Sequence, residues 1–166
     1  MQYKEGKEKF IRTWGELGTN WGINKTMGMI HGLLLIETEA LSSDELMAEL
    51  KISRGNVNMN LRTLVDWGLI HKHEKEGSRK EFFLAEKDIW KVFQQIIKKR
   101  KEKELHPMIH LLEEVGNIQP NDEKSAEFIK MMAELSLFSH KADKALDNLV
   151  SSKANILVSS YLKFMK

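Results

Sequence analysis

The sequence predicts a mainly α-helical fold with a small β-hairpin, arranged as a winged helix-turn-helix with dimerisation helices at both ends. Residues 42–67 read as two short helices joined by a tight turn, and a glycine ends the second helix. Residues 69–86 then read as two strands around the turn "KEGS". A hairpin directly after the second helix is typical of the winged form of this motif.

Composition sets the limits of this interpretation. The chain has 166 residues, of which 42% are hydrophobic, enough for one domain with a helical extension. It has no cysteine, so disulfides and thiolate metal sites are excluded. The first ten residues lack an apolar signal core, and no apolar run is long enough to span a bilayer. We therefore expect a cytoplasmic protein without a membrane partner.

The net charge of +2 hides an uneven distribution. Residues 51–103 carry fourteen basic and seven acidic side chains, a net +7. Residues 1–50 carry five basic and eight acidic ones, a net −3, and residues 104–166 carry seven and nine, a net −2. Basic clustering of this kind is expected for a protein that binds a polyanion. The alternative is a basic face that is merely solvated.

Capping signals define the two helices of the motif. Ser42 and Glu45 form the capping-box pattern at the start of the first helix, which runs to about residue 50. Ser53 is an N-cap candidate for the second helix, over residues 54–67. Gly68 follows where a left-handed residue usually ends a helix.

The second helix has two dissimilar faces. At about 100° per residue, the inward face collects Val57, Leu61, Leu64 and Val65. The opposite face carries Gly55, Asn56, Met59, Arg62 and Thr63, with Arg54 and Asn58 nearer its edge and Asn60 beside the buried side.

The outward face has the side chains that read DNA. Asparagine can hold adenine, arginine can hold guanine, and an apolar atom can meet a thymine methyl. Asparagine is a middling-to-poor helix former, so three in one helix are hard to explain by stability. We therefore predict that double-stranded DNA is the partner; the alternative is a solvated helix face.

The predicted hairpin is basic near its tip. Arg79 and Lys80 lie just past the turn, and Lys72 and Lys75 lie on the other strand. Such a wing can contact the DNA backbone or insert an arginine into the minor groove. The alternative is ordinary surface charge that keeps the hairpin edge from aggregating.

Residues from about 10 to 110 resemble the GbsR-type branch of the MarR superfamily of transcriptional regulators. The matching stretches are "GMIHGLLLIE", "LSSDELMAELKISRGNVNMNLRTLVDWGLI", "EGSRKEFFLAEKDIW" and "RKEKELHPMI". The resemblance implies a homodimeric winged-helix protein that binds operator DNA, usually as a repressor. By position it implies DNA contact by Ser53, Arg54, Asn56, Asn58, Met59, Arg62 and Arg79.

The chain departs from the family pattern near its N-terminus. Met29 stands where many relatives have a basic residue, and a proline often found before that helix is missing. These departures affect the expected effector response and leave the DNA-reading residues unchanged. We divide the chain into an N-terminal dimerisation or effector helix (1–22), the DNA-binding domain (23–88) and C-terminal dimerisation helices (89–166).

The C-terminal region has its own apolar pattern. Apolar residues recur in steps of three and four at Phe128, Met131, Leu135, Phe138, Ala142, Ala145 and Leu149. This heptad-like seam predicts a dimer contact; the alternative is packing within the chain, against residues 88–116. A second apolar helix is expected through Ile156, Leu157, Tyr161 and Phe164. Pro107 should kink or break the long helix that follows Trp90.

Three aromatic residues near the N-terminus suggest an effector site. Members of this branch are linked to compatible-solute pathways, and some sense choline. A quaternary ammonium prefers an aromatic cage, and Phe10, Trp14 and Trp21 could line one. The helix at residues 25–38, in which Gly28 and Gly32 allow close packing, would link that site to the DNA-reading helix. The alternative is that these aromatics belong to the core and the dimer interface.

The sequence shows little sign of a metal site or a catalytic site. His106 and His110 are four residues apart, but no third ligand of a suitable type is near them in the sequence. There is no phosphate-binding glycine loop and no nucleophile elbow. We expect no enzyme activity, cofactor or metal. The remaining alternative is a winged-helix module that binds protein partners without reading DNA sequence.

Overall fold

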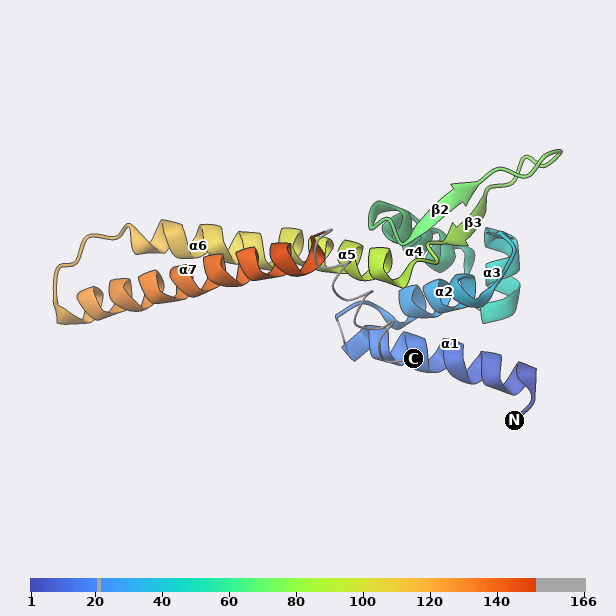
Figure 1. Cartoon of the computed structure of the whole chain (residues 1–166), viewed down its shortest axis with the longest axis horizontal. Helices are drawn as coiled ribbons and strands as arrows, with labels where there is room; N and C mark the ends of the chain where they lie inside the picture. Colours follow the sequence, from blue (N-terminus) through green and yellow to red (C-terminus); the bar gives the residue numbers. More distant parts are fainter. Residues whose placement is uncertain (21, 152–166) are drawn as a thin grey trace. The chain divides into compact units, whose positions relative to one another are not determined.

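The computed structural model describes residues 1–20 and 22–151 and divides the chain into two compact units, residues 1–95 and residues from Ile96 onward. The fold is mainly helical with one small antiparallel sheet, as predicted (Figure 1). No helix in these described ranges is long and apolar enough to cross a membrane.

In the first unit, α1 (Tyr3–Asn20) lies against α2 (Lys25–Ile36) at a crossing that only glycine permits. A Cβ added at Gly28 would lie 2.9 Å from the Cα of Gly15, and one added at Gly32 would lie 2.9 Å from the ring of Trp14. Real Cβ atoms do not approach this closely, so α1 could not pack at this depth on a bulkier α2. The predicted role of Gly28 and Gly32 in close helix packing is confirmed.

The two helices of the motif begin and end where the sequence predicted. In α3 (Ser43–Leu50), Ser42 and Glu45 form both bonds of the capping box. In α4 (Arg54–Asp66), the Ser53 hydroxyl accepts a hydrogen bond from the Asn56 amide. Gly68 has φ = +69°, the left-handed conformation predicted for it. The turn between the helices also holds Lys51 at φ = +54°, a strained position for a residue with a side chain.

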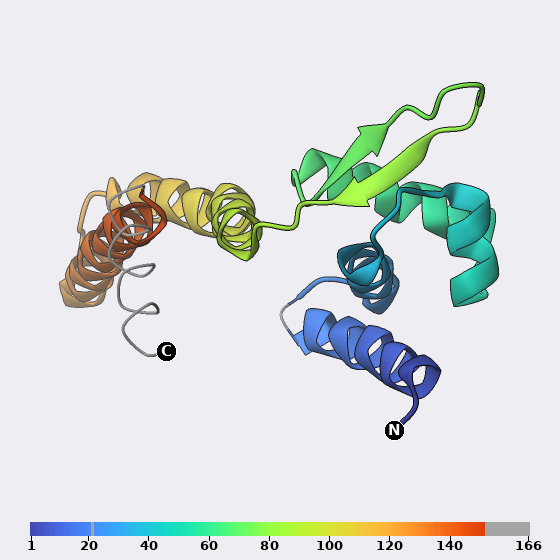
Figure 2. The ribbon, with the colours of Figure 1, turned by 45° about the vertical axis from the view of Figure 1, so that its right-hand side comes forward.

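The hairpin pairs β2 (Ile70–His73) with β3 (Phe82–Ala85), and its tip extends well beyond the paired strands (Figure 2). The strands are shorter than the sequence suggested, because pairing ends at His73 and Phe82. A third strand, β1 (Leu41–Ser42), was not predicted; it pairs with β3 through Leu41 and Phe83. Two residues carry too little pattern to indicate a strand.

Lys87 holds the end of α2. Its ammonium donates to the backbone carbonyls of Leu34, Leu35 and Glu37 at 2.6–2.7 Å. These carbonyls have no partner within the helix, and a cation at a helix C-terminus is favoured by the helix dipole. Lys87, which follows the hairpin, thus links the sheet to the C-terminal end of α2.

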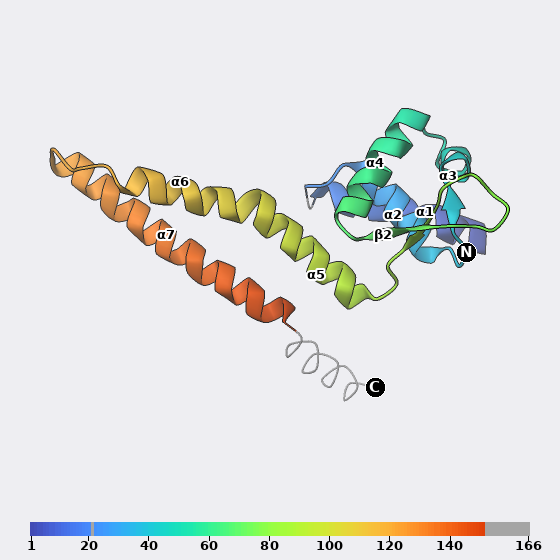
Figure 3. The ribbon, with the colours of Figure 1, turned by 90° about the horizontal axis from the view of Figure 1, so that it is seen from above.

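The second unit is a helical hairpin. Its first arm comprises the end of α5 (Ile89–Arg100), the π-helix η1 (Lys101–Leu105) and α6 (His106–Gly116). The returning arm, α7 (Glu123–Val150), lies beside α6 (Figure 3). The predicted break at Pro107 takes the form of a π turn, in which the His106 amide donates to the Lys101 carbonyl. The wider turn accommodates a proline without ending the helical path.

Lys101 forms ion pairs that join the two arms of this hairpin. Its buried ammonium lies 3.0 Å from the carboxylate of Asp143 and also bonds to Asp147 on α7. Burial opposes the charge, but the hydrogen bonds to Asp147 and Asp143 outweigh it and raise the pKa of Lys101. A buried cation with two carboxylates fixes the register of α7 along η1.

His31 is a buried titratable group at the α1–α2 contact. Its Nδ1 accepts a hydrogen bond from the Trp14 indole at 3.2 Å, and its buried Nε2 has no partner within residues 1–20 and 22–151. Burial, with a smaller effect from Lys87, lowers the pKa of His31 to about 4. The imidazole is therefore neutral at physiological pH.

This pKa predicts a pH-dependent stability. Between pH 6.5 and 4 the unfolded chain binds a proton at His31 that the folded chain does not, so stability falls as the pH falls. The loss should reach about 3 kcal/mol near pH 4. His31→Gln keeps an acceptor for Trp14 and should flatten the curve in this window, measured by urea unfolding. The exposed residue His73 supplies the control, His73→Gln; if both variants follow the parent curve, His31 does not carry the effect.

Candidate DNA-binding surface

The exposed side of α4 carries most of the residues predicted to read DNA. Arg54, Gly55, Met59 and Arg62 are exposed, and 58% of Met59 is accessible to solvent. Asn58 and Thr63 are half-buried at the edges of this face. The inner side buries Val57, Leu61 and Leu64 as predicted, whereas Val65 is only half-buried.

Two of the three asparagines of α4 have structural partners. Asn60 is fully buried: its oxygen accepts from the Asn24 amide at 2.7 Å, and its nitrogen donates to the backbone and side-chain oxygens of Asn56 at 2.8 Å. The half-buried Asn56 in turn donates to Thr26 at 3.4 Å. Stability therefore explains Asn60, contrary to the expectation from helix propensity.

Asn24, Asn60 and Asn56 form a ladder of side-chain amides that are bonded in this order. The side-chain oxygen of Asn24 caps α2 by accepting from the Met27 amide at 2.8 Å, while its nitrogen reaches Asn60. The N-terminus of α2 is thus bonded to the middle of α4. The ladder was not predictable from the sequence, because Asn24 and Asn60 are 36 residues apart.

The basic residues at the edge of this surface are partly paired. Arg54 and Lys80 both contact Asp44 of α3, at 2.9 and 2.7 Å. Lys72 pairs with Glu81 across the hairpin. Arg62 and Arg79 have no ion pair within the described part of the chain. Asp44 was not singled out from the sequence, where an exposed carboxylate in the first turn of a helix looks like ordinary dipole stabilisation.

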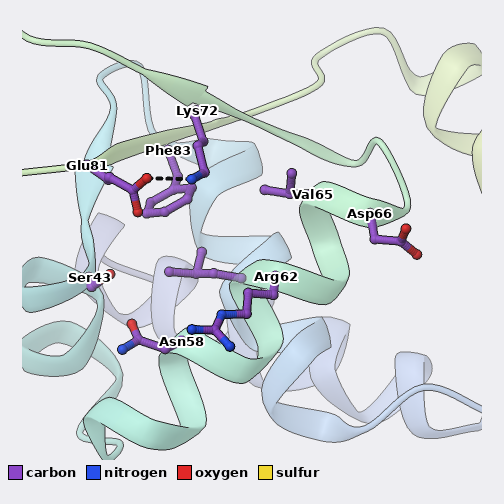
Figure 4. A pocket seen from close by; sticks show the side chains of 9 residues that line it. Ser43, Asn58, Arg62, Val65, Asp66, Lys72, Glu81 and Phe83 are labelled. Atoms are coloured by element: carbon purple, nitrogen blue, oxygen red, sulfur yellow. Dashed lines mark hydrogen bonds and ion pairs between the residues drawn. The ribbon is translucent and has the colours of Figure 1, made fainter.

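A pocket of about 510 Å³ lies between α4 and the hairpin. Figure 4 shows Asn58 and Arg62 side by side on α4, with the Lys72–Glu81 pair across the pocket and Phe83 at its back. The hairpin and helix therefore form one concave surface, in which two predicted DNA contacts lie beside a wing residue.

Two of the three N-terminal aromatics pack against each other and against α2. The rings of Phe10 and Trp14 stack with centroids 5.4 Å apart, and the Trp14 indole is bonded to His31. Trp21 lies outside the described residues. A shallow groove of about 400 Å³ runs past Phe10 between the start of α1 and the end of α2.

The predicted seam of α7 is largely exposed. Phe128, Met131, Leu135, Phe138 and Leu149 are 42–71% accessible. The other face of α7 packs on α6, with Ser139 buried. The second apolar helix, through Ile156, Leu157, Tyr161 and Phe164, lies outside the described residues.

The histidines of the second unit pair with carboxylates. His106 contacts Asp143 at 3.2 Å, and His140 contacts Glu113 at 3.0 Å. Within the described ranges no three His, Cys, Asp or Glu side chains gather in a way that could hold a metal ion.

Comparison with known proteins agrees with this geometry. Residues 33–72 match the family model for bacterial regulatory proteins of the arsR family. The HTH-type transcriptional repressor GbsR of Bacillus subtilis is 26% identical over 154 residues, which cover 91% of this chain and 80% of the relative.

A solved structure of a transcriptional regulator has the same fold. A crystal structure of a transcriptional regulator superposes with a TM-score of 0.61 at 22% identity, covering 86% of this chain and 97% of the other. A Staphylococcus aureus MepR variant bound to an oligodeoxyribonucleotide reaches a TM-score of 0.42 at 16% identity, over 80% of this chain and 94% of that one. Taken with the capped helix pair and the hairpin, the superposition at a TM-score of 0.61 shows a winged helix-turn-helix fold. The similarity to the GbsR repressor over 91% of the chain supports a DNA-binding transcription regulator.

Proposed function

We propose that the protein is a sequence-specific DNA-binding repressor that acts as a homodimer on a two-fold symmetric operator. The observation that carries this proposal is the exposed face of α4, where Met59 and Arg62 project from a helix whose other side is buried. A helix with such a face fits the major groove of B-DNA. The similarity to the GbsR repressor supports the direction of regulation.

The proposed DNA contacts are of two kinds: some residues read the base edges, and others bind phosphates and position the protein. The exposed guanidinium of Arg62 can bind a guanine, the Asn58 amide lies at the edge of the reading face, and Met59 offers an apolar end to a thymine methyl. The helix start at Ser53 and Arg54, and Arg79 and Lys80 of the wing, face phosphates. The Asn56 amide is already bonded to Asn60 and Thr26, so it offers DNA only its remaining donor and lone pair.

A protein-docking role fits this surface less well. Docking surfaces concentrate apolar and aromatic side chains at their centre. On the exposed side of α4, Met59 is the only large apolar residue, and it is flanked by Arg62, Asn58 and Gly55. The composition favours nucleic acid.

Removing the reading residues should reduce sequence preference without unfolding the chain. Arg62→Ala and Asn58→Ala should each weaken binding to a site selected from random DNA by about 1–3 kcal/mol. Both positions are at the surface, so thermal unfolding should change little. The matched control is Arg12→Ala on the exposed side of α1. Parent-like binding by both variants would show that α4 does not read the site.

We further propose that the seam of α7 joins two copies of the chain. Leu135 and Phe138 are large apolar residues left 42% and 71% accessible on one helix face. Exposed apolar stripes at heptad spacing are stabilised by burial against another helix.

Charge on the seam should separate the copies. Leu135→Glu and Phe138→Glu should convert a dimer into a monomer in sedimentation velocity at micromolar concentration. Lys144→Glu lies on an exposed part of the same helix away from the seam and should leave the dimer intact. Dimers that survive both seam substitutions would move the interface to another surface.

We further propose that an effector binds near the N-terminal aromatics, at the contact of α1 with α2. The stacked rings of Phe10 and Trp14 are half-buried, and Trp14 reaches α2 through His31 and Gly32. A ligand bound there could act on α4 through α2 and the amide ladder. Any such effect is limited to the ligand's differential affinity for two states of the dimer.

Choline tests this site directly. Millimolar choline should quench tryptophan fluorescence and change operator affinity about 5- to 150-fold. Phe10→Leu should remove both effects while preserving an apolar side chain. Unchanged fluorescence and unchanged operator affinity would assign Phe10 and Trp14 to packing alone.

A further inference from the structure

We propose that Asp44 is an intramolecular competitor for the DNA phosphates, limiting the affinity of the protein for DNA of any sequence. This inference rests on the proposed function. The residues discussed above are expected to promote DNA binding, whereas Asp44 is expected to weaken it. It is drawn from one contact, in which a single carboxylate joins the reading helix to the wing.

The geometry places Asp44 between two predicted DNA contacts. One carboxylate oxygen lies 2.9 Å from Arg54 at the start of α4, and the other lies 2.7 Å from Lys80 of the wing. The two cations come from segments 26 residues apart in the sequence, yet both are held by the same acidic side chain. A phosphate that bridged the helix start and the wing would occupy a comparable position.

Charge and exposure make this contact reversible. The Asp44 and Arg54 side chains are 40% and 65% accessible, and that of Lys80 is 63% accessible. Exposed ion pairs are weak and are screened by salt. The hydrogen bond from Lys80, together with the charge of Arg54, keeps the pKa of Asp44 below its ordinary value. The carboxylate is therefore ionised wherever the protein meets DNA.

The consequence for binding follows from counterion release. Each phosphate that a cation neutralises contributes about 0.9 to the slope of log affinity against log salt. While Asp44 holds Arg54 and Lys80, this cluster presents a net charge of +1 instead of +2. Phosphates must displace the carboxylate, and its negative charge then stays beside the DNA backbone.

Asp44→Asn tests the proposal. At 100 mM salt the variant should bind random-sequence duplex DNA about five- to tenfold more tightly per protomer, and its salt slope should steepen by about 1. Glu16→Gln is a matched control, since it removes one carboxylate on α1 that pairs with an exposed lysine, Lys25 of α2. The control should match the parent. Circular dichroism and thermal unfolding verify that each variant is folded.

A double-mutant cycle locates the effect. In an Arg54→Gln, Lys80→Gln background, Asp44→Asn should increase affinity much less than in the parent, because the cations it releases are absent. Equal gains in both backgrounds would show a general charge effect and overturn the proposal. Unchanged or weaker binding by Asp44→Asn alone would show that Asp44 positions the cations, and would also overturn it.

The same titrations separate this idea from the proposed function. If the parent binds its selected site well above random DNA while Asp44→Asn behaves like the parent, only the role of Asp44 fails. If the parent binds neither selected nor random DNA, the proposed function fails.

Discussion

The hydrogen bond between Asn24 and Asn60 is the constraint on which the DNA-binding surface depends. Asn60 is the fully buried polar residue of α4, and all three of its hydrogen bonds stay within the α2–α4 contact. A buried amide that loses a partner costs about 1–3 kcal/mol. The bond to Asn24 is the one that depends on how α4 lies against α2, since the other two are made to Asn56 of α4 itself. That orientation turns Met59 and Arg62 outward and sets how far α4 projects from the domain.

The same constraint couples distant parts of the first unit. Asn24 both caps α2 and holds Asn60, so the start of α2 cannot move without disturbing α4. The glycine crossing fixes α1 on α2, and Lys87 fixes the end of α2 to the segment after the sheet. Helix α2 is therefore the element through which a change at α1 would reach the DNA-reading face.

Local signals made much of this fold predictable. Caps at Ser42 and Ser53 and the left-handed Gly68 depend on a few neighbouring residues, so the sequence indicated these helix ends correctly. The exposure of Met59 and Arg62 followed from helical periodicity.

Long-range pairings were not predictable in this way. Strand β1 exists only because Leu41 meets Phe83, and the partners of Asn60 and Asp44 come from other elements. Polar residues that looked alike in the sequence, such as Asn58 and Asn60, differ because one side chain reaches the surface and the other reaches Asn24. The π turn before Pro107 likewise reflects how a continuous helix absorbs a missing amide donor.

Selection of bound sequences from random duplex DNA, followed by footprinting on the selected site, tests the central claim that two copies of α4 read a symmetric operator. We predict an enriched inverted repeat, protected in the major groove at two half-sites whose centres lie about 10 bp apart or a multiple of this. No enrichment, or an enriched sequence without two-fold symmetry, would contradict the account.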